Sequence, residues 1–405
     1  MSDVPLRIRR MGWRGEGMAE DGGQRRLVPG SLPGEEVLAS GSGERLTLER
    51  VISPSPDRVA PVCRHFGQCG GCQLQHWANA PYRAWKAAQV TEALKGRGID
   101  YAVAPALDAH GAGRRRAILH VRRSGTQVTA GFMAARSHRL LDIDACPVLE
   151  PALTPAFDIA RALGQELGDC DVAVTASLGG LDVSVKAARR EREQQKSQLA
   201  QFVRSLGLAR LSVNGEIVAT AVPPRLALGR AEVVPPPGSF LQATALGEAT
   251  LARLVIEHAG KAKRVADLFC GIGPFSFRLA ERARIEAYDN DRAAIAALSA
   301  AVKTTQGLKP IVATVRDLFH EPLVPNELKH FDAAIFDPPR AGAEAQARQL
   351  ARSQVKTIVA VSCDPQSFAR DAEILSAGGY KLQHVTAVDQ FKWSSHVEIV
   401  ALFAR

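Results

Sequence analysis

Short apolar runs alternate with segments of helical periodicity throughout residues 236–405. The runs end in Gly, Asp or Pro, as buried strands do, and the segments between them place apolar residues three and four positions apart, as amphipathic helices do. The expected strands are KRVADLFCG (263–271), ARIEAYDND (283–291), FDAAIFDPP (331–339), VKTIVAVSCDP (355–365) and HVEIVALFA (396–404), and the expected helices include PFSFRLAERA (274–283) and RAAIAALSAAVKT (292–304). This alternation predicts an α/β domain built on a mostly parallel, doubly wound sheet.

The preceding residues show a different pattern, in which short β-like runs are separated by Gly and Pro. Residues 1–52 read as a small β domain, and the segment 54–58 reads as a linker. Residues 53–235 read as a mostly β central domain with one clear helix at 82–97, which would pack on the catalytic domain. The run Pro235–Gly238 marks the boundary to the third domain at 236–405. The expected N-terminal strands are LRIRRM (6–11), RRLVPG (25–30), EEVLAS (35–40) and ERLTLERVI (44–52).

Charge and composition favour a nucleic-acid partner. The formal net charge is +9 and the sequence pI is about 9.4, which suits a polyanion, although a GC-rich genome would also enrich arginine. Arginines at 114–116 and 122–123 flank the first central strand as candidate phosphate ligands. No run approaches the length of a membrane span, and the N-terminus carries no apolar signal-peptide core, so we expect a cytoplasmic protein.

Three of the seven cysteines form a tight cluster with C-x5-C-x2-C spacing, at Cys63, Cys69 and Cys72. An odd cysteine count without an export signal favours a metal site over disulfides. A fourth ligand must come from elsewhere, and Cys146 is the first candidate, with Cys170 second. Four thiolates bind either zinc or an iron–sulfur cluster, and the spacing leaves both open. As zinc ligands, His65 and His76 remain alternatives.

A candidate cofactor site follows the first strand of the α/β domain. The loop Phe269–Gly273 carries Gly271 at the end of a buried strand, where backbone closely approaches a ligand. Because Ser276 stands where a third glycine would be needed, the dinucleotide fingerprint is absent. Asp289 ends the next strand and is placed to accept ribose hydroxyls, and Asp317 follows at a position suited to an adenine amino group. Their order favours an adenosine pocket of the methyltransferase type.

Three further residues form a candidate catalytic set. Asp337 stands at a strand end held extended by two prolines, Cys363 ends the next strand, and Glu398 lies in an apolar strand where an unpaired carboxylate is costly. A thiolate that adds to C6 of uracil makes C5 nucleophilic, so a cysteine suits methylation at C5. The C5 proton must then leave, and Glu398 is the candidate base.

Together these motifs resemble the bacterial RNA (uracil-C5)-methyltransferase family, whose members act on 23S ribosomal RNA or on the tRNA T-loop. The resemblance spans nearly the whole chain and rests on VPGSLPGEEV (28–37), CRHFGQCGGCQLQH (63–76), DACPVLEP (144–151), DLFCGIGPFS (267–276), FDPPRAG (336–342), VSCDP (361–365) and SHVEIVALF (395–403), in the family's order. The resemblance implies an N-terminal OB-like barrel of the TRAM type, a cysteine-cluster domain and a Rossmann-like methyltransferase domain.

The resemblance also implies the site residues. It implies a [4Fe–4S] cluster on the four cysteines Cys63, Cys69, Cys72 and Cys146, with Cys363 as nucleophile and Glu398 as base. It implies S-adenosyl-L-methionine as the cofactor, and its contacts would be Gln242, Phe269, Gly271, Asp289, Asp317 and Asp337. The RNA partner would present an extruded base, and the N-terminal and cysteine segments resemble the ribosomal enzymes most, which favours 23S rRNA over tRNA.

Some positions depart from the family pattern without removing a reacting group. Pro274 replaces a common Asn, Asp289 replaces a common Glu, and Asp364 replaces a frequent Asn beside the nucleophile. Ala243 and Thr244 stand where Val-Asn is common.

The alternative functions are those of a tRNA uridine-C5 enzyme, an RNA cytosine-C5 enzyme that also uses a cysteine, and a non-enzymatic RNA-binding iron–sulfur protein.

Overall fold

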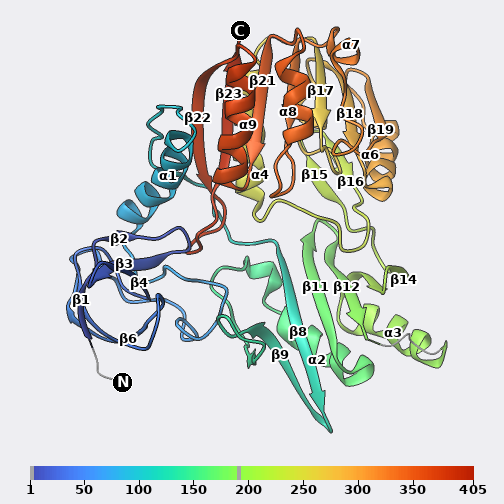
Figure 1. The fold of residues 1–405 in the computed structure, drawn as a ribbon. Coiled ribbons are helices and arrows are strands. Elements are labelled where there is room, and N and C mark those ends of the chain that lie inside the picture. The colour runs from blue at the N-terminus through green and yellow to red at the C-terminus, as the bar shows by residue number, and fades with distance from the viewer. Residues whose placement is uncertain (1–3, 189–192) are drawn as a thin grey trace.

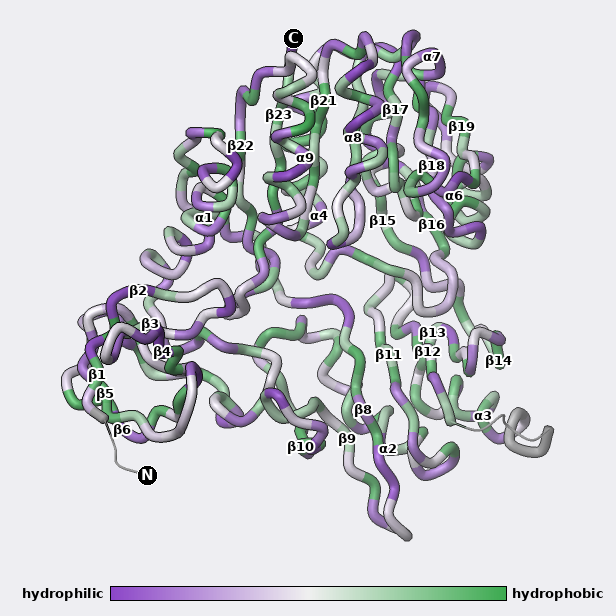
Figure 2. The backbone as a smooth tube through the Cα atoms, viewed as in Figure 1, coloured by the Kyte–Doolittle hydropathy of each residue, from purple (hydrophilic) through white to green (hydrophobic). Residues whose placement is uncertain are grey.

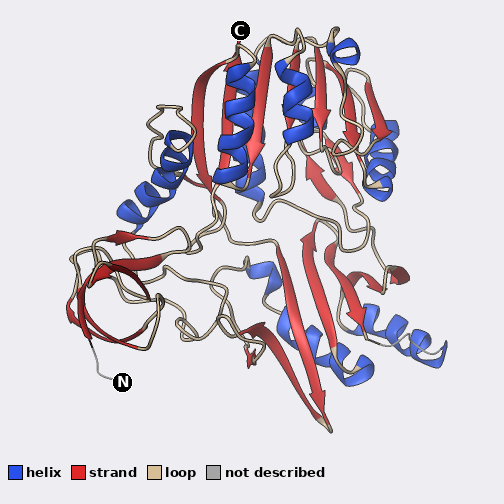
Figure 3. Ribbon diagram, in the orientation of Figure 1, coloured by secondary structure: helices blue, strands red, loops and turns tan. Residues whose placement is uncertain are grey.

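The computed structural model describes residues 4–188 and 193–405, and Figure 1 shows their arrangement. The blue N-terminal strands lie to one side, the green central strands lie beneath, and the yellow-to-red C-terminal sheet lies at the top, flanked by helices. Figure 3 shows the same division by element type, with helices on the C-terminal sheet and few helices elsewhere.

The C-terminal part is built on an eight-stranded sheet that confirms the predicted doubly wound, Rossmann-like fold. In spatial order its strands are β19 (Ile311–Val315), β18 (Arg284–Asp289), β17 (Arg264–Leu268), β20 (Ala333–Phe336), β21 (Thr357–Ser362), β23 (Glu398–Ala404), β22 (Lys381–Asp389) and β7 (Leu107–Asp108). Strands β17 to β21 run parallel, and β23 alone is antiparallel to both of its neighbours. The strand order reverses between β17 and β20, which is where ligands bind in such sheets.

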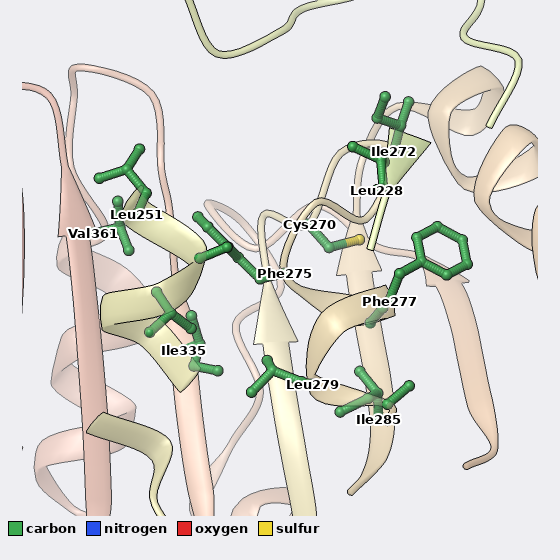
Figure 4. Packing of buried hydrophobic residues seen from close by; sticks show 14 of the residues in the cluster. Leu228, Leu251, Cys270, Ile272, Phe275, Phe277, Leu279, Ile285, Ile335 and Val361 are labelled. Carbon is green, nitrogen blue, oxygen red and sulfur yellow. The ribbon is translucent and has the colours of Figure 1, made fainter. Parts of the chain in front are cut away.

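Helices cover both faces of this sheet. They are α4 (Ala245–Ala259), α5 (Ser276–Leu279), α6 (Arg292–Thr304), α7 (Pro325–Leu328), α8 (Glu344–Ala351) and α9 (Pro365–Ala377). Alternate strand residues point to opposite faces, so Val265 joins the core under α4 and α6 while Ala266 joins the core under α8 and α9. Figure 4 shows Cys270, Phe275 and Phe277 within the first of these cores. Figure 2 shows the middle strands of this C-terminal sheet as largely hydrophobic.

Helix α1 (Asn79–Lys95) packs on the catalytic sheet although it lies far earlier in the chain. It contacts α9 and β22. Its fully buried Lys86 forms an ion pair with Asp389 at 2.5 Å, at the end of β22. The helix begins three residues before the predicted start because Pro81 fits the first turn, where its missing N–H costs nothing.

The described residues of the central part form a seven-stranded sheet and two α-helices. In spatial order the strands are β10 (Leu140–Asp142), β9 (Gln127–Met133), β8 (Arg116–Ser124), β11 (Cys170–Ser177), β12 (Gly180–Ala187), β13 (Leu208–Val213) and β14 (Glu216–Thr220), and they are accompanied by the 3-10 turn Pro151–Leu153, α2 (Ala156–Leu167) and α3 (Glu193–Ser205). The hairpin of β15 (Leu226–Leu228) and β16 (Ala231–Val233) precedes Pro235 in sequence, yet its apolar side chains belong to the core under α4.

The N-terminal strands form two three-stranded antiparallel sheets. One contains β1 (Val4–Arg7), β5 (Glu36–Ser40) and β6 (Thr47–Ser53), and the other contains β2 (Arg10–Met11), β3 (Glu16–Asp21) and β4 (Gln24–Pro29). The predicted strand 6–11 is therefore divided between two sheets. The predicted helix 274–283 shortens to α5, because the chain turns at Leu279 and β18 begins at Arg284.

Candidate active site

A cavity of about 710 Å³ opens where the strand order reverses, at the carboxyl ends of β17, β20 and β21. Its lining includes seven of the eight predicted cofactor and catalytic residues: Gln242, Phe269, Gly271, Asp289, Asp337, Cys363 and Glu398. They come from segments up to 156 residues apart, since 398 − 242 = 156. The fold thus brings the predicted set together, with Asp317 as the exception.

The loop after β17 adopts backbone conformations that place it against the cavity. Phe269 has a φ of 63° and Gly271 a φ of 53°, both in the left-handed region. The Gly271 N–H donates to Asp289 Oδ2 at 2.8 Å, which ties this loop to the end of β18. Gly273 must lack a side chain, because a Cβ there would lie 2.8 Å from Leu298 of α6. The sequence therefore folds this loop tightly against α6, as a close backbone approach requires.

An aromatic pair lies beside this loop. Phe269 and Phe319 have ring centroids 5.3 Å apart, and both line the cavity. Asp317 does not line it. Its carboxylate instead accepts from the Phe319 N–H at 3.0 Å and contacts His320 Nδ1 at 2.9 Å. Asp317 therefore supports the segment that carries Phe319.

Asp337 lies at the centre of the cavity wall, directly after β20. Burial, with the charge of Asp267 behind it, raises its pKa to about 7, while a hydrogen bond from Gln242 Nε2 at 3.1 Å acts against that rise. Asp267 is itself fully buried, and burial raises its pKa to about 7 as well, against a 2.5 Å hydrogen bond from Ser276. The carboxyl groups of Asp337 and Asp267 therefore both have pKa values near neutral pH.

Cys363 and Glu398 face each other across two neighbouring strands. The antiparallel register of β21 and β23 ends with Ser362 paired to Ile399, so Cys363 and Glu398 are the next residues on the two sides, and both line the cavity. Burial, followed by the charges of Glu398 and Asp337, raises the pKa of the Cys363 thiol to about 12. Asp364, the next residue, caps α9 by accepting from Gln366 and Ser367 N–H groups, which fixes the turn that carries the thiol.

Glu398 is buried and in contact with other polar groups of the cavity. Burial and the charge of Asp337 raise its pKa to about 8, while a hydrogen bond from Gln390 Nε2 at 3.1 Å and the charges of Lys86 and Arg340 act against that rise. Such a carboxyl is a suitable proton acceptor near neutral pH, because its pKa lies close to the working range.

A second cavity, of about 370 Å³, lies beside the first. All four predicted cysteine ligands line it, and so does His65. Burial raises the pKa values of Cys69, Cys72 and Cys146, the last to about 11. Cys170 lies apart, buried in the core of the central sheet, and His76 does not line the cavity. Within the described residues, no three His, Cys, Asp or Glu side chains stand close enough to hold a single metal ion.

The two cavities share a wall. Gly71 and Arg114 line both of them. The N–H groups of Gln73 and Leu74 donate to the Trp393 carbonyl at 2.8 and 3.0 Å, so the cysteine segment holds the loop that leads to Glu398. From α1, the Tyr82 hydroxyl accepts from the Trp393 N–H at 2.8 Å.

Arg115, one of the expected phosphate ligands, does not lie on the surface. Arg115 is buried, and its guanidinium pairs with Glu248 at 2.6 Å and donates to the Gln242 carbonyl at 3.1 Å. It therefore joins the central part to α4 and is not available to RNA. Arg114 remains at the cavity wall, with its guanidinium 5.5 Å from the Phe391 ring centroid.

Comparison with known proteins identifies the family. Residues 234–405 match the family model described as tRNA (Uracil-5-)-methyltransferase. The 23S rRNA (uracil(1939)-C(5))-methyltransferase RlmD of Halomonas elongata is 35% identical over 423 residues, which cover 96% of this chain and 86% of that protein. The chain belongs to the RNA (uracil-5-)-methyltransferase family. An uncharacterized RNA methyltransferase of Brucella suis is 45% identical over 404 residues, covering 99% of this chain and 97% of the relative.

A solved structure agrees with this methyltransferase fold over nearly the full length. It is the Pyrococcus abyssi tRNA (uracil-54, C5)-methyltransferase in complex with S-adenosyl-L-homocysteine, with a TM-score of 0.78, 24% identity, and coverage of 99% of this chain and 100% of that one. Family membership confirms the prediction of an enzyme that methylates RNA, and it excludes the alternative of a non-enzymatic RNA-binding iron–sulfur protein. Within residues 4–188 and 193–405, no helix of this methyltransferase is long and apolar enough to cross a membrane.

Sequence reasoning missed several residues of the methyltransferase cavity. Phe319 and the 73% exposed Phe240 both line it, and Gln390 lies behind it with no exposed surface. Phe240 carries a weak signal, because a large aromatic lies just after the Pro-Gly boundary and two residues before Gln242. Gln390 carries a signal only in hindsight, as a polar residue that follows β22 directly and is buried.

Proposed function

We propose that this enzyme methylates C5 of a specific uridine in 23S rRNA, with S-adenosyl-L-methionine as cofactor and a covalent Cys363–C6 adduct on the substrate. The observation that carries the proposal is that Cys363 and Glu398, which lie next to the last paired residues of β21 and β23, both line the 710 Å³ cavity. The 35% identity to a 23S rRNA enzyme supports the ribosomal substrate, and a tRNA uridine is the alternative.

In this mechanism the Cys363 thiolate adds to C6 of the extruded uracil, and negative charge develops through C5 to O4. When bound, the cofactor supplies the methyl group that C5 takes up. Glu398 then removes the C5 proton, and elimination of the Cys363 thiolate restores the ring. Because the pKa of Cys363 is raised to about 12, the thiol must lose its proton only once substrate and cofactor have changed its surroundings.

The same proposal assigns cofactor contacts to Gln242, Phe269, Gly271, Asp289 and Asp337, all on the cavity wall. Asp289 still has lone pairs for ribose hydroxyls after it accepts from the Gly271 and Asp291 N–H groups. The rings of Phe269 and Phe319 offer apolar surface for an adenine, and Asp317 acts through its hold on the Phe319 backbone.

The proposal also places a [4Fe–4S] cluster on Cys63, Cys69, Cys72 and Cys146. Its support is that all four of these cysteines line one cavity of about 370 Å³. Zinc would need all four sulfurs about 2.3 Å from one point, and the described residues contain no such group. A cluster places the sulfurs further apart, around a larger body. The N-terminal sheets are proposed as the OB-like RNA-binding barrel of TRAM type, in a cytoplasmic enzyme.

Nucleoside mass spectrometry tests the reaction. Anaerobically purified protein is incubated with S-adenosylmethionine and unmodified ribosomal RNA or tRNA. New 5-methyluridine in ribosomal RNA supports the proposal, and 5-methyluridine in tRNA alone moves the substrate to the alternative. New 5-methylcytosine, or no product from protein that binds cofactor, contradicts it. Iron and zinc analysis of the same preparation decides the nature of the metal site.

A further inference from the structure

Gln390 occupies a position between the two functional halves of the cavity. It follows β22 directly and has no exposed surface. Its Nε2 donates to Gln242 Oε1 at 2.6 Å and to Glu398 Oε1 at 3.1 Å. One side chain thus touches both a proposed cofactor contact and the proposed base.

The direction of these hydrogen bonds is fixed by the neighbours. Gln242 donates its own Nε2 to the Asp337 carboxylate, so its Oε1 is the end that faces Gln390. Gln390 must therefore present its amide nitrogen, whose two N–H groups match the two acceptors. The result is a continuous polar chain from Asp337 through Gln242 and Gln390 to Glu398.

Packing holds the carboxamide in place. A Cβ on Gly247, in the first turn of α4, would lie 2.6 Å from Gln390 Oε1 and 2.7 Å from Gln390 Cβ. Thr244 caps the same turn by accepting from the Gly247 N–H at 2.8 Å. Gln390 Oε1 has no hydrogen-bond partner among the described residues. A buried acceptor left unsatisfied is costly, and such costs are retained where a group has a functional task.

We propose that Gln390 is a positioning residue for proton removal: its amide holds the Glu398 carboxylate in the orientation that accepts the C5 proton and links it to Gln242. The inference rests on the proposed function of Glu398. An N–H directed at Glu398 stabilises its charged form, as Lys86 and Arg340 also do, while burial and Asp337 oppose ionisation. Without this N–H, Glu398 would ionise at higher pH, and its carboxylate would no longer be held in the orientation that accepts the C5 proton.

The test replaces Gln390 by Met, which keeps the length of the side chain and removes both donors. The matched control is Gln383→Met, the same change at an exposed position of β22. We expect Gln390→Met to lower turnover by about 10- to 100-fold, because a misplaced base loses part of its catalytic contribution. We also expect the rising limb of its pH–rate profile to move to higher pH.

A second readout separates positioning from general damage. If proton removal becomes slow after methyl transfer, a denaturation-resistant protein–RNA adduct must accumulate, as it should in Glu398→Gln. RNA containing 5-deuterouridine should then show a kinetic isotope effect on turnover in Gln390→Met and a smaller one in the wild type. Gly247→Ala, which crowds the carboxamide but keeps its amide, should show the same signature more weakly and serves if Gln390→Met does not fold.

Two failures are distinguishable. A wild-type enzyme that makes no 5-methyluridine and no adduct contradicts the proposed function itself. An active wild type, together with a Gln390→Met variant that matches Gln383→Met in turnover, pH limb and adduct level, overturns the role of Gln390. Slow turnover without adduct and with an unchanged pH limb overturns it as well.

Discussion

The Glu398→Gln variant should be inactive, and it should become increasingly more stable than the wild type as the pH rises from about 5 to about 7. In the folded protein, burial and the charge of Asp337 raise the pKa of Glu398 from an ordinary 4.5 to about 8. Between these two values the unfolded chain loses the proton and the folded chain keeps it. The folded state therefore binds more protons, and its stability falls as the pH rises through this window.

The size of this effect follows from the two pKa values. A one-unit pKa difference corresponds to about 1.4 kcal/mol, and from pH 5 to pH 7 the linkage lowers the free energy of unfolding by about 2 kcal/mol. Gln keeps the oxygen that accepts from Gln390 but cannot ionise. Relative to the wild type, the variant should therefore gain about 2 kcal/mol between these pH values, or about 2 °C in Tm for a chain of this length.

Thermal or urea unfolding of both proteins at pH 5, 6 and 7 measures this gain. Glu373→Gln is the control, because Glu373 lies at the surface in a 3.0 Å ion pair with Arg97 and should show little change with pH. A Glu398→Gln variant whose stability relative to the wild type stays constant from pH 5 to pH 7 would refute the reasoning. It would mean that Glu398 is already ionised in the folded protein.

Three further outcomes are expected. Cys363→Ala should bind cofactor with wild-type affinity, measured calorimetrically, and form neither product nor adduct, so robust turnover would exclude covalent catalysis. Lys86→Met should lower the free energy of unfolding by about 3–5 kcal/mol in urea denaturation, because it leaves Asp389 buried without its 2.5 Å partner; a loss under about 1 kcal/mol would show that the pair is solvated. Cys146→Ser should lose bound iron in elemental analysis while Cys170→Ser keeps it, and equal loss in both would remove Cys146 from the ligand set.

The fold and the site could be predicted from the sequence where apolar periodicity and chemically reactive residues occur in the same segment. The alternation after residue 236 predicted the doubly wound sheet, because buried parallel strands must be apolar and end at the ligand edge. Asp289, Asp337 and Cys363 end or directly follow parallel strands, so their meeting in one cavity is a consequence of parallel topology. Glu398 begins the antiparallel strand β23 and reaches the same cavity from the opposite strand direction, and Gln242 was inferred from family resemblance.

Other features could not be predicted because they depend on contacts between distant segments. The helix at 82–97 was expected to pack on the catalytic domain, but nothing local indicates that its partners are α9 and β22, or that Arg115 pairs with Glu248 133 residues away. Asp317 has the residue type and position of an adenine ligand, yet its side chain bonds the adjacent backbone instead. Gln390 is recognisable only once Gln242 and Glu398 are seen on either side of it.

The position of β23 has a consequence for the order of folding. This strand lies between β21 and β22, runs against both, and brings Glu398 into the cavity, although it is the last strand described along the chain. The loop before it is held by Tyr82, 311 residues earlier. Pairing between distant segments is slow to form. A chain in which β23 has not yet inserted can therefore have its β17 loop in place and still lack the proposed base Glu398, so that the cavity is complete only when the whole sheet is formed.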